Sequence, residues 1–301
     1  MIPWITYSDA ITEALRVEMR LDPTVLCVVG KSSHGAARPT DELLREFGAS
    51  RVTEHDQGRS ILAATAAAAS EGMRPVCELE LDALAEEDSE ALGEAASSGA
   101  VVIRLIGDGG AGGAMPALDG WLARCPELRA VSAATAADAK GLLISAVRDP
   151  DPVCFVESRD LYNSVCDGVP EGNHTVALGE ARLIRQGTEI VVLAHGAAAI
   201  AAEQTAAGMG DEVGVIDLRT LRPLDRDAIV ATVRETGKVL IAEDPHASTG
   251  FAADLVDMIY DEVPDVLDAP IRELGTAPGA TGANDQLTQS LNEACRELVA
   301  F

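Results

Sequence analysis

Short apolar runs of strand length alternate with segments of helical character along the whole chain. In the first half, the strand-like runs are 24–30, 74–81, 100–107 and 152–158. The segments between them carry helix signals, as in 40–48, where Thr40 precedes the helical pattern and Gly48 ends it. Alternating strands and helices build parallel sheets with crossover helices packed on their faces. The sequence therefore predicts an α/β fold.

The polar stretch 166–176, "CDGVPEGNHTV", interrupts this alternation and has the composition of a linker. A second set of strand and helix patterns follows it, beginning with the apolar run 188–196. A length of 301 residues is suited to two domains of about 100–200 residues each. We therefore expect two three-layer α/β domains with mainly parallel sheets, 1–168 and 169–301.

The chain is strongly acidic, with 49 Asp and Glu against 23 Lys and Arg and a net charge of −26. This charge argues against nucleic acid and against anionic membrane surfaces as partners, because both would repel it. No apolar run approaches the ~20 residues of a membrane span, and the first residues lack a signal peptide's regions. The six cysteines form no CxxC pair, which predicts neither a disulfide framework nor a zinc site. We expect a cytoplasmic protein.

A glycine-rich loop, 105–113, follows one of the predicted strands. It is a poor dinucleotide fingerprint, because Pro116 interrupts the helix that should follow and Glu127 comes too early for the ribose. Its Gly-Asp-Gly around Asp108 resembles the start of the motif that binds magnesium and thiamin diphosphate. That motif needs a downstream Asn to complete the oxygen shell, and the next Asn, Asn163, is far too distant. The diphosphate half-site is therefore predicted to lie outside this chain.

Four segments, in order, resemble the beta subunit of the thiamin-diphosphate-dependent component of 2-oxo acid dehydrogenase complexes, in the transketolase-like group. These segments are 138–162, 169–197, 215–225 and 267–275. The resemblance implies a pyrimidine-binding domain followed by a transketolase C-terminal domain. It also implies thiamin diphosphate with magnesium, held mainly by an alpha-type partner in an alpha2-beta2 tetramer. Potassium, which many members bind, would lie at Ala146, Asp149 and Asp151.

The resemblance also locates the family's catalytic acid, at the start of the alanine-rich helix near 61–70. In the family a Glu there hydrogen-bonds a ring nitrogen of the aminopyrimidine, and only a carboxylic acid can share that proton. Counting back without gaps from Gly72 places Gly58 at the Glu position. The nearest acid is Asp56, which we predict to take over this role, with Glu54 as the other candidate.

Further departures fall on the side expected to meet the cofactor. The family's aromatic residue beside the pyrimidine corresponds to Leu84, and its active-site His corresponds to Ala114. His55 or His34 would then handle protons near neutral pH, because imidazole titrates in that range.

Two functions are consistent with these observations. The first is a catalytic beta subunit that acts on a 2-oxo acid or ketose-like donor, by decarboxylation or by acyl or ketol transfer, with a rebuilt proton site. The alternative is a catalytically degenerate subunit with a structural or regulatory role in such an assembly. An Asp before a helix, such as Asp56, is otherwise commonly an N-cap.

Overall fold

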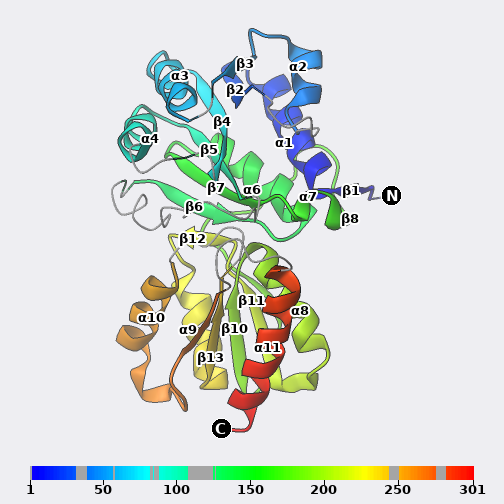
Figure 1. Cartoon of the computed structure of the whole chain (residues 1–301), viewed down its shortest axis with the longest axis vertical. Coiled ribbons are helices and arrows are strands. Elements are labelled where there is room, and N and C mark those ends of the chain that lie inside the picture. Colours follow the sequence, from blue (N-terminus) through cyan, green and yellow to red (C-terminus); the bar gives the residue numbers. More distant parts are fainter. Residues whose placement is uncertain are drawn as a thin grey trace. The chain divides into compact units, whose positions relative to one another are not determined.

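The computed structural model describes most of the chain as two compact units, which divide between Leu178 and Gly179 (Figure 1). The predicted boundary after residue 168 falls in the segment that leads to this division. The described residues are 2–31, 39–56, 58–81, 84, 88–107, 125, 127–243, 251–275 and 283–301.

The N-terminal unit is built on a parallel sheet whose strands run in the order β6-β7-β5-β4-β2-β3 (Figure 1). Most strand residues are buried, since helices cover both faces of a parallel sheet. The four strands predicted for this half are confirmed. The bounds are β2 (Val25–Gly30), β3 (Val52–His55), β4 (Arg74–Glu80), β5 (Val102–Gly107), β6 (Arg129–Ser132) and β7 (Val153–Ser158).

Helices form a layer on each face of this sheet (Figure 1). On one face α1 packs against α6, where Lys140 Nζ lies 2.8 Å from Glu13 Oε1 and Arg148 Nη2 lies 2.6 Å from Glu18 Oε1. On the other face α3 packs against α4. The bounds are α1 (Tyr7–Leu21), α2 (Asp41–Phe47), α3 (Arg59–Ser70), α4 (Asp88–Ser97), α6 (Ala136–Arg148) and α7 (Leu161–Ser164).

Two details of this unit differ from the sequence-based expectation. The predicted linker 166–176 begins with a strand, β8 (Cys166–Gly168), which pairs antiparallel with β1 (Trp4–Thr6). Thr40 stands at the N-cap of α2, as predicted, but its hydroxyl makes no capping bond there and donates instead to Glu78 Oε2 at 3.4 Å. Both differences arise from partners distant in the sequence.

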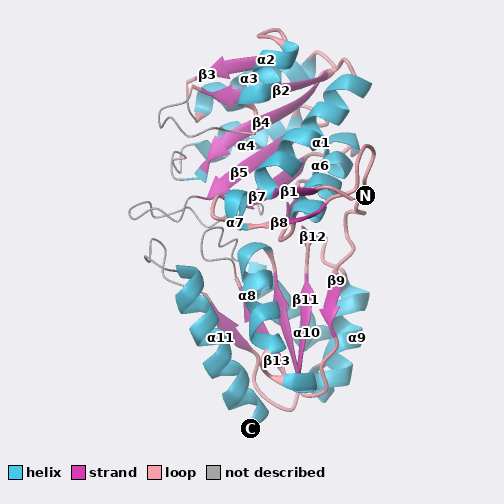
Figure 2. Cartoon of the chain, turned by 90° about the vertical axis from the view of Figure 1, so that its right-hand side faces the viewer, coloured by secondary structure: helices cyan, strands magenta, loops and turns pink. Residues whose placement is uncertain are grey.

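The C-terminal unit has its own sheet, of order β14-β13-β10-β11-β9, in which only β9 runs antiparallel to its neighbour (Figure 2). Its strands are β9 (Arg182–Arg185), β10 (Ile190–Ala194), β11 (Val213–Asp217), β13 (Val239–Ala242) and β14 (Arg272–Leu274), with a short strand β12 (Thr220–Arg222). Its helices are α8 (Gly196–Ala207), α9 (Arg226–Thr236), α10 (Phe251–Glu262) and α11 (Ala283–Val299), with 3₁₀ turns at Gly210–Glu212 and Pro264–Val266. Helices again lie on both sides of the sheet. The mainly parallel α/β architecture is therefore confirmed for both units.

Among the described helices, none is both long enough and apolar enough to cross a membrane.

Candidate functional site

The N-terminus of α3, where the family's acid is expected, begins with a glycine instead of a capping side chain. Gly58 is the N-cap of α3, with φ of 66°, and makes no side-chain capping bond. Glycine tolerates this positive φ, whereas a residue with a Cβ would be strained in it. The first turn of the helix, which begins at Arg59, carries no acidic residue. Gly58 and the first turn of α3 therefore offer no carboxylate.

Asp56 lies at the same end of the sheet but is turned toward a cation. Its Oδ1 lies 3.0 Å from Lys31 Nζ, and the side chains are 83% and 65% exposed. Ser60 Oγ donates to the main-chain oxygen of Asp56. Asp56 is therefore not the N-cap of the helix, because Gly58 holds that position. An exposed ion pair of this kind is weak, so the carboxylate is readily exchanged to another partner.

His55 and Glu54 end the strand β3 beside Asp56. The His55 Nε2 atom lies 3.2 Å from Thr53 Oγ1, and the side chain is partly buried. The N–H of Lys31 donates to the carbonyl of His55 at 2.8 Å, which joins the ends of β2 and β3. Glu54 is exposed. The structure thus brings these three predicted residues to the carboxyl end of two adjacent strands, where open α/β sheets bind ligands.

The remaining residues predicted near the cofactor are described only in part. Leu84 is buried, and its N–H donates to the Leu81 carbonyl at 3.3 Å. His34 and Ala114 lie outside the described residues.

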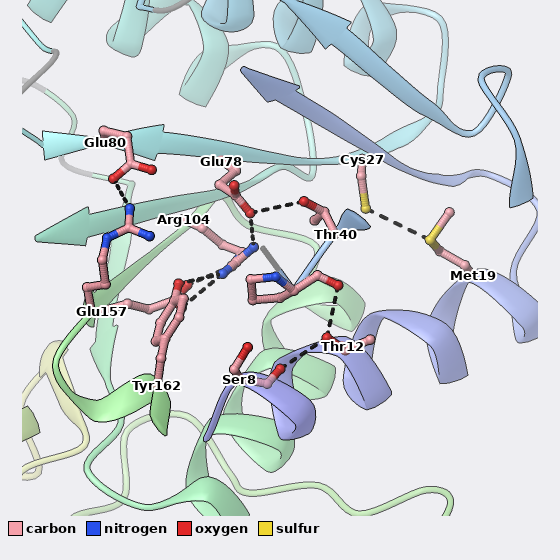
Figure 3. Close-up of polar contacts among 12 residues, drawn as sticks. Ser8, Thr12, Met19, Cys27, Thr40, Glu78, Glu80, Arg104, Glu157 and Tyr162 are labelled. Atoms are coloured by element: carbon pink, nitrogen blue, oxygen red, sulfur yellow. Dashed lines mark hydrogen bonds and ion pairs between the residues drawn. The ribbon is translucent and has the colours of Figure 1, made fainter. Parts of the chain in front are cut away.

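A buried charged cluster joins three central strands of this sheet (Figure 3). Arg104, on β5, is fully buried and binds Glu157 through two hydrogen bonds of 2.6 and 2.9 Å. Its Nη1 also donates to Glu78 Oε2 at 2.8 Å, and the Tyr162 hydroxyl donates to Glu157 at 2.9 Å. Three neighbouring strands and α7 are thereby joined by charge-assisted hydrogen bonds.

The surroundings fix the protonation of this cluster. Burial and the negative charge of Glu157 raise the pKa of Tyr162 well above its ordinary value. Burial acts to lower the pKa of Arg104, but the charge of Glu157 and its neighbours raises it well above its ordinary value. Arg104 is thus a permanent cation and Tyr162 a permanent donor. The cluster was not predicted from the sequence, although the Arg inside the apolar run 100–107 was a usable signal.

A second ion pair, also missed, joins Glu80 at the end of β4 to Arg159 just after β7. The Arg159 guanidinium lies 5.8 Å from the centre of the Tyr162 ring, as in a cation–π contact. Both charged side chains are partly exposed. The carboxyl end of the central strands therefore carries charged groups beyond those predicted at β3.

The predicted potassium residues lie at the opposite end of the sheet. Ala146 is in the last turn of α6, and Asp149 and Asp151 lie between this helix and the start of β7. The structure brings the three together in one segment.

The chemistry of these groups fits a thiamin diphosphate half-site only in part. An aminopyrimidine needs an acid that shares a proton with its ring; the first turn of α3 has none, so Asp56 and Glu54 at the end of β3 are the candidates in this part of the described chain. A magnesium diphosphate needs a shell of oxygen ligands. In the described part of the chain, no group of three or more His, Cys, Asp or Glu side chains could hold a metal.

Comparison with known proteins identifies both units. The "Transketolase, pyrimidine binding domain" family matches residues 4–165, and the "Transketolase, C-terminal domain" family matches residues 179–293. A solved structure described as "Split gene transketolase, inactive beta4 tetramer" has a TM-score of 0.73 at 18% identity, with 98% of each chain covered. The fold is therefore that of a transketolase-type chain with its pyrimidine-binding and C-terminal domains.

Two relatives that are similar over most of both chains show which family within this class the chain belongs to. The chain is 34% identical over 287 residues to the pyruvate dehydrogenase E1 component subunit beta of Bacillus subtilis (strain 168), covering 89% of this chain and 88% of that protein. It is 33% identical over 305 residues to the acetoin:2,6-dichlorophenolindophenol oxidoreductase subunit beta of the same organism, covering 91% and 89%. The chain belongs to the pyruvate dehydrogenase E1 beta-subunit family. The resemblance predicted from the sequence is confirmed.

Proposed function

We propose that this chain is the beta-type subunit of a heteromeric thiamin-diphosphate-dependent enzyme that acts on a 2-oxo acid or a ketose-like donor. The reaction is decarboxylation, or acyl or ketol transfer. One observation carries the proposal. Over about nine tenths of its length, the sequence of this chain is similar to the beta subunits of pyruvate dehydrogenase E1 and of acetoin:2,6-dichlorophenolindophenol oxidoreductase. In this proposal residues 1–168 form the pyrimidine-binding domain and residues 169–301 the C-terminal domain.

The proposal requires an alpha-type partner. That subunit supplies the diphosphate and magnesium ligands, because the Gly-Asp-Gly around Asp108 in this chain lacks the downstream Asn that completes such a site. The assembly is an alpha2-beta2 tetramer in the cytoplasm. When bound, thiamin diphosphate supplies the electron sink that stabilises a carbanion after the 2-oxo acid loses its carboxylate.

Within this chain, residues at the end of β3 share and transfer the protons of the reaction. Asp56 takes the role of the family's Glu, because its ion pair with Lys31 is exposed and easily exchanged. His55 stands beside it, as the last residue of β3, and is the partner that would pass protons to and from this acid. Gly58 is buried and has no Cβ, so no side chain of its own would obstruct a ring placed at the start of α3. Leu84, Ala114 and His34 are proposed to line the cofactor side, and Glu54 is the alternative acid.

A second function, a degenerate subunit that supports or regulates the alpha-type partner, is favoured by one observation. Gly58 is the N-cap of α3, at the position that the sequence comparison with the family predicts for its acid, and the first turn of the helix carries no acid. If Asp56 stays with Lys31, Asp56 cannot share a proton with the cofactor ring.

Assembly and cofactor binding test the proposal together. The chain is co-expressed with an alpha-type subunit whose own sequence carries Gly-Asp-Gly followed by a correctly spaced Asn. Light scattering gives the mass of the complex, and calorimetry measures thiamin diphosphate with magnesium on the complex and on this chain alone. We expect a tetramer and cofactor binding by the complex only. Micromolar binding to the isolated chain, or failure of the two subunits to associate, contradicts the proposal.

A further inference from the structure

Two arginines from other strands hold the C-terminal end of α6. Arg74, the first residue of β4, donates from Nη1 to the carbonyl of Val147 at 2.9 Å and to the carbonyl of Asp149 at 3.1 Å. These carbonyls belong to the last turn of the helix and to the residue that follows it. One guanidinium therefore binds two oxygens at the helix end.

Arg129, the first residue of β6, pairs with both carboxylates that follow the helix. Its Nη2 lies 2.9 Å from Asp151 Oδ2, and its Nε lies 3.5 Å from Asp149 Oδ1. The N–H of Asp151 also donates to Asp149 Oδ1, at 2.9 Å. The oxygens of this short segment are thus engaged by two guanidinium groups and by the backbone.

A positive charge stabilises the C-terminal end of a helix. The last carbonyls of a helix lack intrahelical donors, and the helix dipole places partial negative charge there. Arginine near a helix C-terminus supplies both donors and positive charge. At α6 the chain meets this requirement with side chains carried by β4 and β6.

A monovalent ion would have to use the same oxygens. The carbonyl of Asp149 already accepts from Arg74, and the carbonyl of Ala146 accepts from the N–H of Asp149 at 3.3 Å. An ion bound to Asp149 O would lie within a few ångströms of the Arg74 guanidinium, where two positive charges repel each other. The donor set suits an arginine cap better than a potassium ion.

We infer that Arg74 and Arg129 form a built-in cationic cap of α6, in the place that the family resemblance assigns to potassium, so that the fold of this chain does not depend on that ion. The cap ties the start of two sheet strands to the helix that packs on α1. Removing it loosens the α1–α6 layer. This inference stands on contacts within the N-terminal unit and does not rest on the proposed function.

Thermal unfolding of the full chain tests the inference. Midpoints are measured in potassium chloride, sodium chloride and tetramethylammonium chloride at equal ionic strength, for the native chain and for Arg74→Met. The native midpoints are expected to agree within about 1 °C, and Arg74→Met is expected to unfold about 3 °C lower or more in all three salts. Arg226→Met is the control, because it removes an exposed arginine paired with Glu262 at 3.0 Å. Its midpoint is expected to stay within about 1 °C of the native value.

A clear rise of the native midpoint in potassium alone, or an Arg74→Met chain as stable as the native one, overturns the inference. A second measurement does not depend on the variants. In crystals grown with rubidium chloride, anomalous scattering is expected to show no peak beside the Asp149 carbonyl. A rubidium peak within coordination distance of that oxygen would show that a monovalent ion binds at the end of α6, which contradicts the arginine cap.

Discussion

Asp56 Oδ1 lies 3.0 Å from Lys31 Nζ across the ends of two adjacent strands, β3 and β2. This pair joins the acid nearest to Gly58 with one of the chain's three lysines. Both side chains are mostly exposed, so water screens the attraction and the pair holds neither strand in place. Asp56 can therefore exchange Lys31 for another partner, as a catalytic acid must.

Replacing Lys31 by Met is expected to leave the fold almost unchanged. The free energy of unfolding should shift by less than about 1 kcal/mol, because an exposed ion pair contributes only that much. Denaturant unfolding at low and high salt measures the shift. A loss of several kcal/mol would mean that the pair is structural and that Asp56 is not available for exchange.

The buried cluster around Arg104 is expected to behave in the opposite way. Arg104→Met leaves the carboxylates of Glu157 and Glu78 in the core without their cation, and breaking a buried pair costs about 3–5 kcal/mol. Tyr162→Phe removes only the hydroxyl and should cost about 1–2 kcal/mol. Denaturant unfolding measures these losses, with Arg226→Met as the control. Because Arg226 is exposed, this control removes an arginine charge without leaving a buried carboxylate unpaired. An Arg104→Met chain as stable as this control refutes the structural role of the cluster.

His195 is expected to make the fold sensitive to mild acid. Burial lowers the pKa of His195 to about 3, from an ordinary value of 6.5. Below about pH 6.5 the unfolded chain binds a proton at this imidazole while the folded chain does not, so stability falls as the pH falls. The loss between pH 7 and pH 5 amounts to about 2 kcal/mol.

Denaturant unfolding at the two pH values checks this, with His195→Asn as the variant that cannot titrate. The drop in stability from pH 7 to pH 5 should be smaller in His195→Asn by about this amount. His174→Asn, in a partly exposed position, serves as control. An equal drop in the native chain and in His195→Asn would show that the imidazole is protonated in the folded state.

The six cysteines are expected to separate into one reactive thiol and five protected ones. Cys166 is exposed, whereas the other five are buried. Burial raises the pKa of Cys27 and Cys77 to about 12 and that of Cys295 to about 11. At pH 8 a thiol of pKa about 12 is ionised to only ~10⁻⁴, and the thiolate is the reactive form.

Titration of the native chain with a disulfide reagent should therefore show one fast equivalent, and six after unfolding. Cys166→Ser should abolish the fast equivalent. Two or more fast equivalents in the native chain would mean that the buried strands open readily.

The strand and helix pattern was predictable because it is local. Apolar runs such as 24–30 and 152–158 are buried on both faces of a parallel sheet, and this leaves a continuous apolar signature in the sequence. Thr135 could likewise be recognised as the cap of α6, because it accepts from the N–H of Asp138 within the same turn.

The rest depends on contacts between distant parts of the chain. Arg104 meets Glu78 across 26 residues and Glu157 across 53, and no local pattern connects three single charges on three strands. Arg74 reaches Asp149 across 75 residues, so the capped end of α6 had no signature either. At the candidate site, the glycine before α3 and the acids Glu54 and Asp56 could be located from the sequence, but the ion pair of Asp56 with Lys31 could not.

The most direct test of the account is turnover of a 2-oxo acid by the complex of this chain with its alpha-type partner, comparing the native chain with Asp56→Asn. Asn keeps the size of the side chain but cannot share the proton, so we expect turnover by the native complex and a loss of about 10²-fold or more in the variant, with assembly and unfolding unchanged. Equal turnover by the two complexes, or none by a correctly assembled native complex, would contradict the role of Asp56.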